Sequence, residues 1–353
     1  MSGQSFELNF REALEARESM VLSPAAAKAK DSLGRLHPIE LDDMRTNFQR
    51  DRDRILHSKS FRRLSHKTQV FLAPEGDHYR TRLTHTLEVS QIARSITRAL
   101  GLNEDLTEAI AYGHDLGHTP FGHTGESALS RALARHRGID PDYNETGLLY
   151  KHNLQSVRIV EKLENNGKGL NLSREVVDGI KHHNGKVRPQ TYEGKIVAIS
   201  DRIAYVCHDI DDAIRAKLLT EDDLPKSTHA ILGLNSSERI SRMVHDTIQT
   251  SYERNDIYMS ERVWSALLEL REFLFNKVYT SSDAKREEPK AQRMIGQLFD
   301  HYINHFDEVP EDYKIHSSDD TSIQVVDYIA GMTDRYAISK YQELFIPRAW
   351  RLK

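Results

Sequence analysis

Apolar residues recur at helical spacing along most of this chain. The clearest case is residues 80–100, where the apolar positions share one side of a helix: Val89, Ile92, Ala93, Ile96 and Leu100. Gly101 is typical of a helix C-terminus, and Asn103 can cap a second helix that ends near Gly117. Ser173 can cap another. The same spacing predicts further helices over 152–164, 173–183, 195–219, 230–254, 260–278 and 296–305.

Alternation typical of β-strands is scarce, so the predicted fold class is all-α. The best strand candidate is 70–72, closed by Pro74 and Gly76. Residues 281–290 are polar and are predicted to form a linker. We expect three regions, each mainly helical: an N-terminal arm over 1–45, a catalytic core over 46–219, and a C-terminal region over 220–353 that completes the pocket and an oligomer interface.

Composition narrows the function classes. The 353 residues carry 49 Lys and Arg against 53 Asp and Glu, so no overall positive charge indicates nucleic-acid binding. An anionic substrate would therefore need a local basic pocket. The single cysteine, Cys207, excludes a disulfide within the chain and a Cys-rich zinc site. Because there is no apolar signal region and no run long enough to span a membrane, we expect a cytoplasmic protein without membrane contacts.

The segment Gly-His-Asp-Leu-Gly-His-Thr-Pro, residues 113–120, carries the strongest chemical signal. His114 lies four residues after Ile110 and so shares the inward face of its helix, with Asp115 directly after it. An imidazole and a carboxylate side by side suit a divalent ion such as Mn, Mg, Fe or Zn. A lone His-Asp pair is usually an ordinary surface feature. Here the same run also contains His118, His123 and Glu126, which favours a site.

Two other helices carry polar residues where apolar ones are expected. His85 precedes Val89 by one helical turn and faces inward, beside Arg82. A hydrogen-bonded core histidine is the alternative interpretation, but a buried cation next to it suits an anionic substrate better. In 195–219, one stripe is polar and contains Asp201, Tyr205, Asp209 and Asp212. That stripe is equally typical of a solvated helix face.

Four segments together resemble a known family: RTRLTHTLEVSQIAR (80–94), HDLGHTPFGHTGE (114–126), SDRIAYVCHDIDDA (200–213) and DYIAGMTDRYA (327–337). They are similar to the HD-domain phosphohydrolases, and more closely to the dGTPase-like deoxynucleoside triphosphate triphosphohydrolases. The resemblance implies a helical HD core with helical extensions at both ends. It also implies hydrolysis of a dNTP to deoxynucleoside and tripolyphosphate by attack at the α-phosphorus. One divalent metal ion would be held by His85, His114, Asp115 and Asp201.

The resemblance also implies roles for further residues. His123 and Glu126 match the family's catalytic pair, and His118 is expected beside them as a catalytic or substrate contact. Phosphate contacts are implied for Arg82, His152 and Arg202, and sugar contacts for Gln69, Tyr205 and Asp209. Weaker candidates are Arg62, Arg63, His182, His183, Asp334 and Tyr336, whereas Lys67 is expected on a solvated charged face.

Two rival functions stay open from sequence. One is an HD-family nucleotidase or phosphodiesterase acting on another nucleotide, which would need fewer cations for a phosphate tail. The other is a nucleic-acid-binding regulator with a vestigial metal site, against which the intact ligand set argues. The expected partners are a dNTP substrate, other copies of the chain in a tetramer or hexamer, and an effector that is either a nucleotide or single-stranded DNA.

Overall fold

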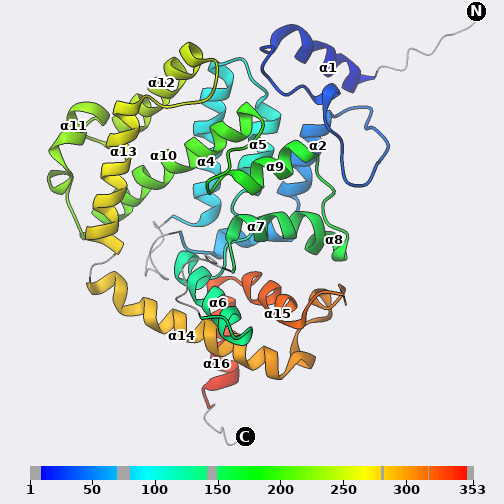
Figure 1. Ribbon diagram of the computed structural model, residues 1–353, viewed down its shortest axis with the longest axis vertical. Coiled ribbons are helices and arrows are strands. Elements are labelled where there is room, and N and C mark those ends of the chain that lie inside the picture. The colour runs from blue at the N-terminus through cyan, green and yellow to red at the C-terminus, as the bar shows by residue number, and fades with distance from the viewer. Residues whose placement is uncertain (1–8, 70–79, 141–148, 280–281, 317, 348–353) are drawn as a thin grey trace, which may run out of the picture.

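The computed structural model describes residues 9–69, 80–140, 149–279, 282–316 and 318–347. These residues contain no β-strand, only isolated bridges that pair Arg35 with Ser173 and Thr68 with Thr81. The all-α prediction is therefore confirmed (Figure 1). The strand candidate at 70–72 lies outside the described residues.

Four helices form the centre of the fold and carry most of the expected site. They are α4 (Arg82–Ala99), α5 (Glu104–Gly113), α9 (Arg174–His182) and α10 (Tyr192–Arg215). α10 packs against α4, α5 and α9, and α2 (Asn47–Leu56) packs against α5 (Figure 1). Their contact faces are fully buried and aliphatic, with Ile96, Leu106, Ile110 and Ile203 in one core. Apolar burial of this kind is the main stabilising term in the fold.

The predicted helix starts follow from capping chemistry, with one exception. The Asn103 side chain accepts from the Leu106 N–H, as expected for the α5 cap. Ser173 occupies the N-cap of α9 but makes no side-chain cap bond. Its hydroxyl hydrogen-bonds Asp51 instead, because that buried carboxylate also pairs with Arg35 and needs further donors.

The C-terminal half differs from the sequence prediction in two places. The predicted 230–254 helix is two helices, α11 (Lys226–Leu232) and α12 (Ser236–Arg254), separated at Gly233, whose φ is 104°. A positive φ favours glycine and ends a helix. The predicted linker at 281–290 was wrong: it forms the start of α14 (Ser282–Asn304). Ala, Glu, Lys and Arg are strong helix formers even without an apolar stripe.

A second core lies beside the first. Its buried residues come from α14, α6 (Gly122–His136), α15 (Thr321–Ala330) and α16 (Asp334–Phe345). α13 (Glu261–Leu274) belongs to the first core together with α11 and α12. The three predicted regions and their boundaries stay a prediction.

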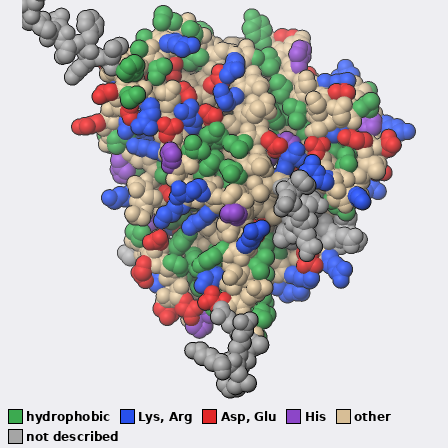
Figure 2. Space-filling model, turned by 180° about the vertical axis from the view of Figure 1, so that it is seen from behind, with side chains coloured by type: hydrophobic (Ala, Val, Ile, Leu, Met, Phe, Trp, Pro, Cys, Tyr) green, Lys and Arg blue, Asp and Glu red, His purple; other side chains and the backbone are tan. Residues whose placement is uncertain are grey.

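The remaining elements are short or peripheral. They are α1 (Phe10–Val21), α3 (Lys59–Arg63), α7 (His152–Arg158), α8 (Glu164–Gly167), the π-helical turns Ile159–Leu163 and Phe275–Tyr279, and the 3-10 turns Ala29–Asp31, Leu64–His66, Glu221–Asp223, Phe306–Glu308 and Glu311–Tyr313. None of the helices described is both long and apolar enough to cross a membrane. Figure 2 shows basic and acidic side chains intermingled on one face, in keeping with the nearly balanced charge.

Candidate metal centre and active site

Three central elements bring the predicted metal ligands together. His85 comes from α4, Asp201 from α10, and His114 and Asp115 from the turn after α5. His85 Nε2 lies 3.0 Å from Asp201 Oδ1. His114 Nε2 lies 3.4 Å from Asp115 Oδ1 and 3.7 Å from Asp201 Oδ1. Donor atoms of His85, His114 and Asp115 all lie within 4.8 Å of one another, so the predicted ligands converge on one point.

The local hydrogen bonds show that this point suits a cation. His114 Nδ1 lies 2.6 Å from the Ala111 carbonyl oxygen, a contact in which the ring nitrogen donates. In the neutral ring Nε2 then carries a lone pair, and it has no hydrogen-bond partner although it is buried. His114 Nε2 and the carboxylate oxygens of Asp115 and Asp201 are then three acceptors that face one another. Such an arrangement is stable only with a positive charge among the three atoms. Two imidazoles and two carboxylates are suitable ligands for a borderline or hard divalent ion.

The pKa values of His114 and Asp115 are shifted in the directions that a site for positive charge requires. Burial favours the neutral ring of His114, yet the Asp115 and Asp201 carboxylates raise its pKa to about 9. Burial also opposes ionisation of Asp115, but His114, His118 and Arg82 hold the pKa of that carboxyl well below its usual range. The site therefore keeps its carboxylates charged and attracts positive charge.

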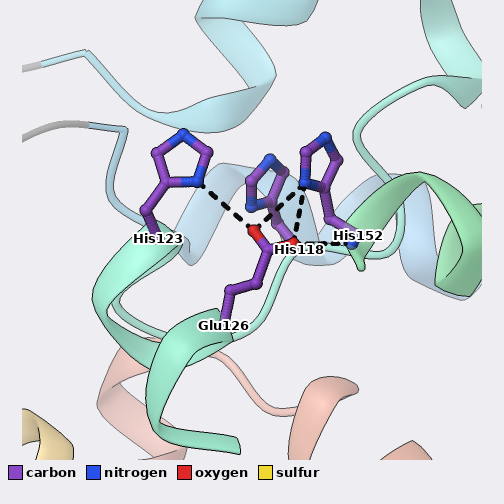
Figure 3. Close-up of side chains that lie close together, drawn as sticks. All are labelled: His118, His123, Glu126 and His152. Carbon is purple, nitrogen blue, oxygen red and sulfur yellow. Dashed lines mark hydrogen bonds and ion pairs between the residues drawn. The ribbon is translucent and has the colours of Figure 1, made fainter. Parts of the chain in front are cut away.

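A second cluster lies beside the first and contains the predicted catalytic residues (Figure 3). Glu126 lies between two imidazoles: its Oε2 is 3.3 Å from His123 Nδ1 and 3.1 Å from His152 Nδ1. The His118 ring stacks on the His152 ring with centroids 3.9 Å apart. His118 Nε2 also lies 3.2 Å from Asp115 Oδ1, so His118 links the two clusters.

The members of this second cluster differ in exposure and charge. The Glu126 side chain is 7% exposed and the His123 side chain is 61% exposed. Burial opposes ionisation of Glu126, but hydrogen bonds from His123 and His152 hold its pKa far below the usual value. Burial and the Arg82 charge lower the pKa of His118 well below its ordinary value. A permanent carboxylate thus orients an exposed imidazole, the arrangement needed for proton transfer.

Gly117 allows this arrangement because the chain passes very close to α7. A Cβ added at Gly117 would lie 2.2 Å from the His152 carbonyl oxygen and 2.3 Å from the Ser156 backbone nitrogen. The Gly117 N–H donates to the Ser156 hydroxyl, and the Tyr150 hydroxyl donates to the Gly117 carbonyl. The glycine therefore sets the distance between His118 and His152.

A pocket of about 710 Å³ opens beside the clusters. Four residues predicted from sequence line it: Gln69, His123, Tyr205 and Asp209. Its other wall comes from α13 and α14, through Leu268, Arg271, Glu272, Phe275, Glu288 and Gln292. No signal in the sequence distinguished these residues, because their polar and apolar positions follow the spacing of any surface helix.

Three other predicted residues take supporting positions. Arg82 is 2% exposed and donates to Asp115 Oδ2 at 2.9 Å. His183 is buried, with its Nε2 3.3 Å from His152 Nε2, and thus extends the histidine cluster. Arg202 lies over the Trp264 ring at 5.4 Å and does not line the large pocket.

Lys67 corrects the sequence prediction, which placed it on a solvated face. It is 2% exposed, and its ammonium donates to the backbone carbonyls of His118 and Ala330. Burial lowers its pKa to about 7. Charge alone suggested exposure, whereas two distant carbonyl groups create a buried site for it.

Two weaker candidates lie near the C-terminus, Asp334 and Tyr336, and only Asp334 contacts the segment that leads into α6. Asp334 is buried and accepts from the Phe121 N–H and from the Thr68 N–H and hydroxyl. Tyr336 is 43% exposed and its hydroxyl contacts that of Tyr328. Neither residue is among those that line the large pocket. Asp334 therefore holds the turn that joins His118 to the start of α6, where His123 lies.

Comparison with known proteins agrees with this geometry. The HD domain family model matches residues 82–206, and the phosphohydrolase-associated domain model matches residues 257–343. The first range contains the four predicted metal ligands and the second contains Asp334. A solved structure of a hypothetical protein from Aquifex aeolicus covers 85% of this chain and 69% of its own at 20% identity, with a TM-score of 0.42, too low to support an argument.

Curated relatives extend over nearly the whole chain. A deoxyguanosinetriphosphate triphosphohydrolase-like protein from Caldanaerobacter subterraneus subsp. tengcongensis is 54% identical over 344 residues, covering 97% of this chain and 98% of the relative. A protein of the same name from Clostridium tetani is 45% identical over 354 residues, covering 97% and 98%. With its converging His and Asp ligands, this chain belongs to the HD-domain, deoxyguanosinetriphosphate triphosphohydrolase-like family of phosphohydrolases.

Proposed function

We propose that this protein hydrolyses deoxynucleoside triphosphates to deoxynucleoside and tripolyphosphate, using one divalent ion held by His85, His114, Asp115 and Asp201. The observation that carries the proposal is the adjacency of two clusters and one pocket. His118 contacts both the Asp115 carboxylate and the His152 ring, and His123 lines the large pocket. A phosphate at the metal ligands would therefore lie next to an oriented imidazole.

The proposed metal ligands would hold the ion, and the ion together with the nearby Arg82 would bind the α-phosphate. A bound divalent ion polarises a phosphoryl group and stabilises charge that develops in the transition state. Arg82 donates to Asp115 Oδ2 and can share its guanidinium between that carboxylate and a phosphate oxygen. His118, held neutral by burial and by Arg82, can donate or accept one hydrogen bond there.

The reaction requires two proton movements. The oxygen of a water molecule forms a bond to the α-phosphorus, and the bond between that phosphorus and the 5′-oxygen breaks. One proton leaves the attacking water and one proton reaches the 5′-oxygen, giving a deoxynucleoside and tripolyphosphate. His123 is placed to move one of these protons, because Glu126 fixes its Nδ1 and leaves Nε2 directed away from the carboxylate.

The pocket side of α10 supports binding of a deoxyribose. Tyr205 and Asp209 lie one helical turn apart and both line the large pocket together with Gln69. Burial raises the pKa of Asp209 well above its usual value. A protonated carboxyl can both donate and accept, which suits a sugar hydroxyl. The tyrosine ring beside it would exclude a 2′-hydroxyl by contact with the sugar.

Product analysis tests the proposal directly. The protein is incubated with Mn²⁺ or Mg²⁺ and each dNTP, singly and mixed, and the products are separated by ion-exchange chromatography. We expect tripolyphosphate and deoxynucleoside from the wild type and a large loss of both from His123→Ala. Orthophosphate or pyrophosphate as the first product would instead indicate another member of the HD superfamily, a nucleotidase or phosphodiesterase. Turnover of a ribonucleotide at the same rate would contradict the role of Tyr205.

A further inference from the structure

A basic groove lies between α6 and α14, outside the catalytic machinery. It has a volume of about 400 Å³ and is lined by Arg131 and Arg135 of α6 and by Arg293, Gln292 and Gln297 of α14. The two helices pack along one another (Figure 1). The Arg135 guanidinium extends across the groove: its Nη2 lies 3.6 Å from where a Cβ at Gly296 would be. We call these three arginines and their surroundings the arginine groove.

The three arginines differ from their neighbours in having no acidic partner. Within the described part of the chain, no carboxylate lies within ion-pair distance of Arg131, Arg135 or Arg293. By contrast, Arg137 of the same segment pairs with Asp320, and Arg158 pairs with both Asp319 and Asp327. Among the residues that the structure describes, Asp300 alone is acidic and lines the groove, so three guanidinium groups there face one carboxylate.

The three side chains are exposed, so their positive charge is available to attract an anion from solvent. Arg131 and Arg135 are four residues apart on α6, where like charges destabilise a helix. Arg293 adds a third positive charge from the facing helix. Three guanidinium groups in a concave site match the geometry of phosphate oxygens, which they can bind in a bidentate manner.

The dimensions of the groove favour a short anion with several charges. Arginines on successive turns of one helix and on the facing helix can all contact an elongated anion at once, whereas one orthophosphate meets only some of them. A long nucleic-acid strand would need a basic track, yet the whole chain carries a net charge of −4. We propose that the arginine groove binds a linear oligophosphate, the chemistry shared by free tripolyphosphate and a nucleotide tail.

The groove adjoins the large pocket without being part of it. Gln292 lines both, and successive turns of α6 contribute first His123 and Ser127 to the pocket and then Arg131 and Arg135 to the groove. An anion in the groove would therefore lie roughly two to three helical turns from His123. The proposal holds whether or not the large pocket cleaves a dNTP, because it concerns binding alone.

Calorimetric titration of sodium tripolyphosphate into the metal-stripped protein tests the proposal. We expect saturable binding that weakens with added salt, and a roughly tenfold loss of affinity in Arg131→Gln/Arg135→Gln because charge-assisted hydrogen bonds are removed. Arg262→Gln is the matched control, since Arg262 is exposed on α13 and lines neither site. Arg82→Gln, which removes the cation beside Asp115, should leave the binding unchanged. The double variant should fold, with a melting temperature no lower than that of the wild type, because a repulsion has been removed.

The controls separate this proposal from the proposed function. Loss of binding in Arg82→Gln with full binding in the arginine variant would place the oligophosphate at the catalytic centre and overturn the assignment. Tight binding of a single-stranded oligonucleotide that tripolyphosphate cannot displace would overturn it as well. A dNTP titrated in parallel distinguishes the two sources. Tighter binding than tripolyphosphate, with the same arginine dependence, identifies a nucleotide tail, and weaker binding identifies the free oligophosphate.

Discussion

At the residue scale, Glu126 connects most of the proposed chemistry. Its carboxylate contacts the rings of both His123 and His152, and its Oε1 also accepts from the His152 backbone N–H. Because the group is buried and kept ionised by these contacts, it cannot be replaced by a neutral group without changing the basicity of both rings. It positions His123, the histidine proposed to transfer a proton, and need not touch the substrate.

We therefore expect Glu126→Gln to lower kcat by about 10²-fold or more, the usual size of a general acid–base contribution. The bound metal content should not change, because the metal ligands belong to the other cluster. Steady-state kinetics and metal analysis of the purified variant provide the two readouts. Glu253→Gln on the exposed face of α12 is the control. A variant with normal kcat would show that His123 does not depend on this carboxylate.

Glu193, which lies outside the metal site, should make the stability of the fold depend on pH. It is fully buried in the first turn of α10, where it accepts from the N–H groups of Ala27 and Asn103, and burial raises its pKa from 4.5 to about 7. Between these pH values the folded state keeps a proton that the unfolded chain releases. The stability that depends on this proton is thus present below pH 4.5 and is lost as pH rises towards 7.

Glu193→Gln should remove this loss. The variant should gain stability relative to the wild type as pH rises from 5 to 8, by about 3 kcal/mol at most. Urea unfolding of both proteins at several pH values gives the difference directly, and the other titrating groups cancel in the comparison. A difference that is independent of pH would mean that Glu193 is ionised in the folded protein at every pH tested.

At the element scale, close packing of helices fixes the site. The turn after α5 carries two of the proposed metal ligands and His118, and Gly117 lets it lie against the backbone of α7. Helix positions could be predicted because apolar spacing and caps are local properties. The break at Gly233 and the helical state of 281–290 were missed, since the first depends on one residue's φ and the second on helix propensity without an apolar stripe.

Gly117→Ala tests this packing. The added methyl group would meet backbone atoms that no side-chain rotation can move, so α7 and His152 must shift. We expect a loss of roughly 1–3 kcal/mol in unfolding free energy, as for other overpacked sites, together with a fall in kcat. Gly296→Ala on α14 is the matched control, since its Cβ has only an ordinary contact. Equal melting temperatures for the two variants would refute the close approach.

At the scale of the whole molecule, the C-terminal helices α15 and α16 hold the segment between His118 and the start of α6 in place. Lys67 ties the His118 carbonyl to the end of α15, and Asp334 at the start of α16 accepts from Phe121, whose φ is 63°. A non-glycine residue at positive φ is strained, so outside contacts must hold it there. The range matched by the phosphohydrolase-associated domain thus supports the range matched by the HD domain.

Asp334→Asn should weaken this support. Both oxygens of the Asp334 carboxylate accept hydrogen bonds, whereas the amide nitrogen of asparagine cannot accept one. At least one of these bonds is therefore lost, and the turn between His118 and the start of α6 should become less ordered. We expect kcat to fall several-fold with little change in KM, because Asp334 does not line the pocket. Asp307→Asn, which alters an exposed carboxyl, is the control. An unchanged kcat in a stably folded D334N variant would show that the loop holds its conformation by itself.

The N-terminal arm bears on assembly. Its segment from residue 20 to residue 44 exposes large apolar side chains: Met20, Val21, Leu33, Leu36, Ile39, Leu41 and Met44. In the proposed homo-oligomer a neighbouring copy would cover some of these side chains. We expect light scattering to give a multiple of 40.6 kDa and Leu36→Lys/Met44→Lys to reduce it. A wild-type particle of single-chain mass at micromolar concentration would contradict the expected homo-oligomer.

The sequence by itself determined the helical class, the start of most central helices, and which histidines and carboxylates are candidates for a metal site. These properties depend on spacing along one chain and on residue type. Only the tertiary structure decided that Lys67 is buried, that Asp334 anchors the turn before α6, and that α13 and α14 form one wall of the pocket. The contacts of Lys67 with Ala330 and of Asp334 with Phe121 join residues more than 200 positions apart. No local pattern encodes them, because burial and charge pairing depend on which surfaces meet in the folded molecule.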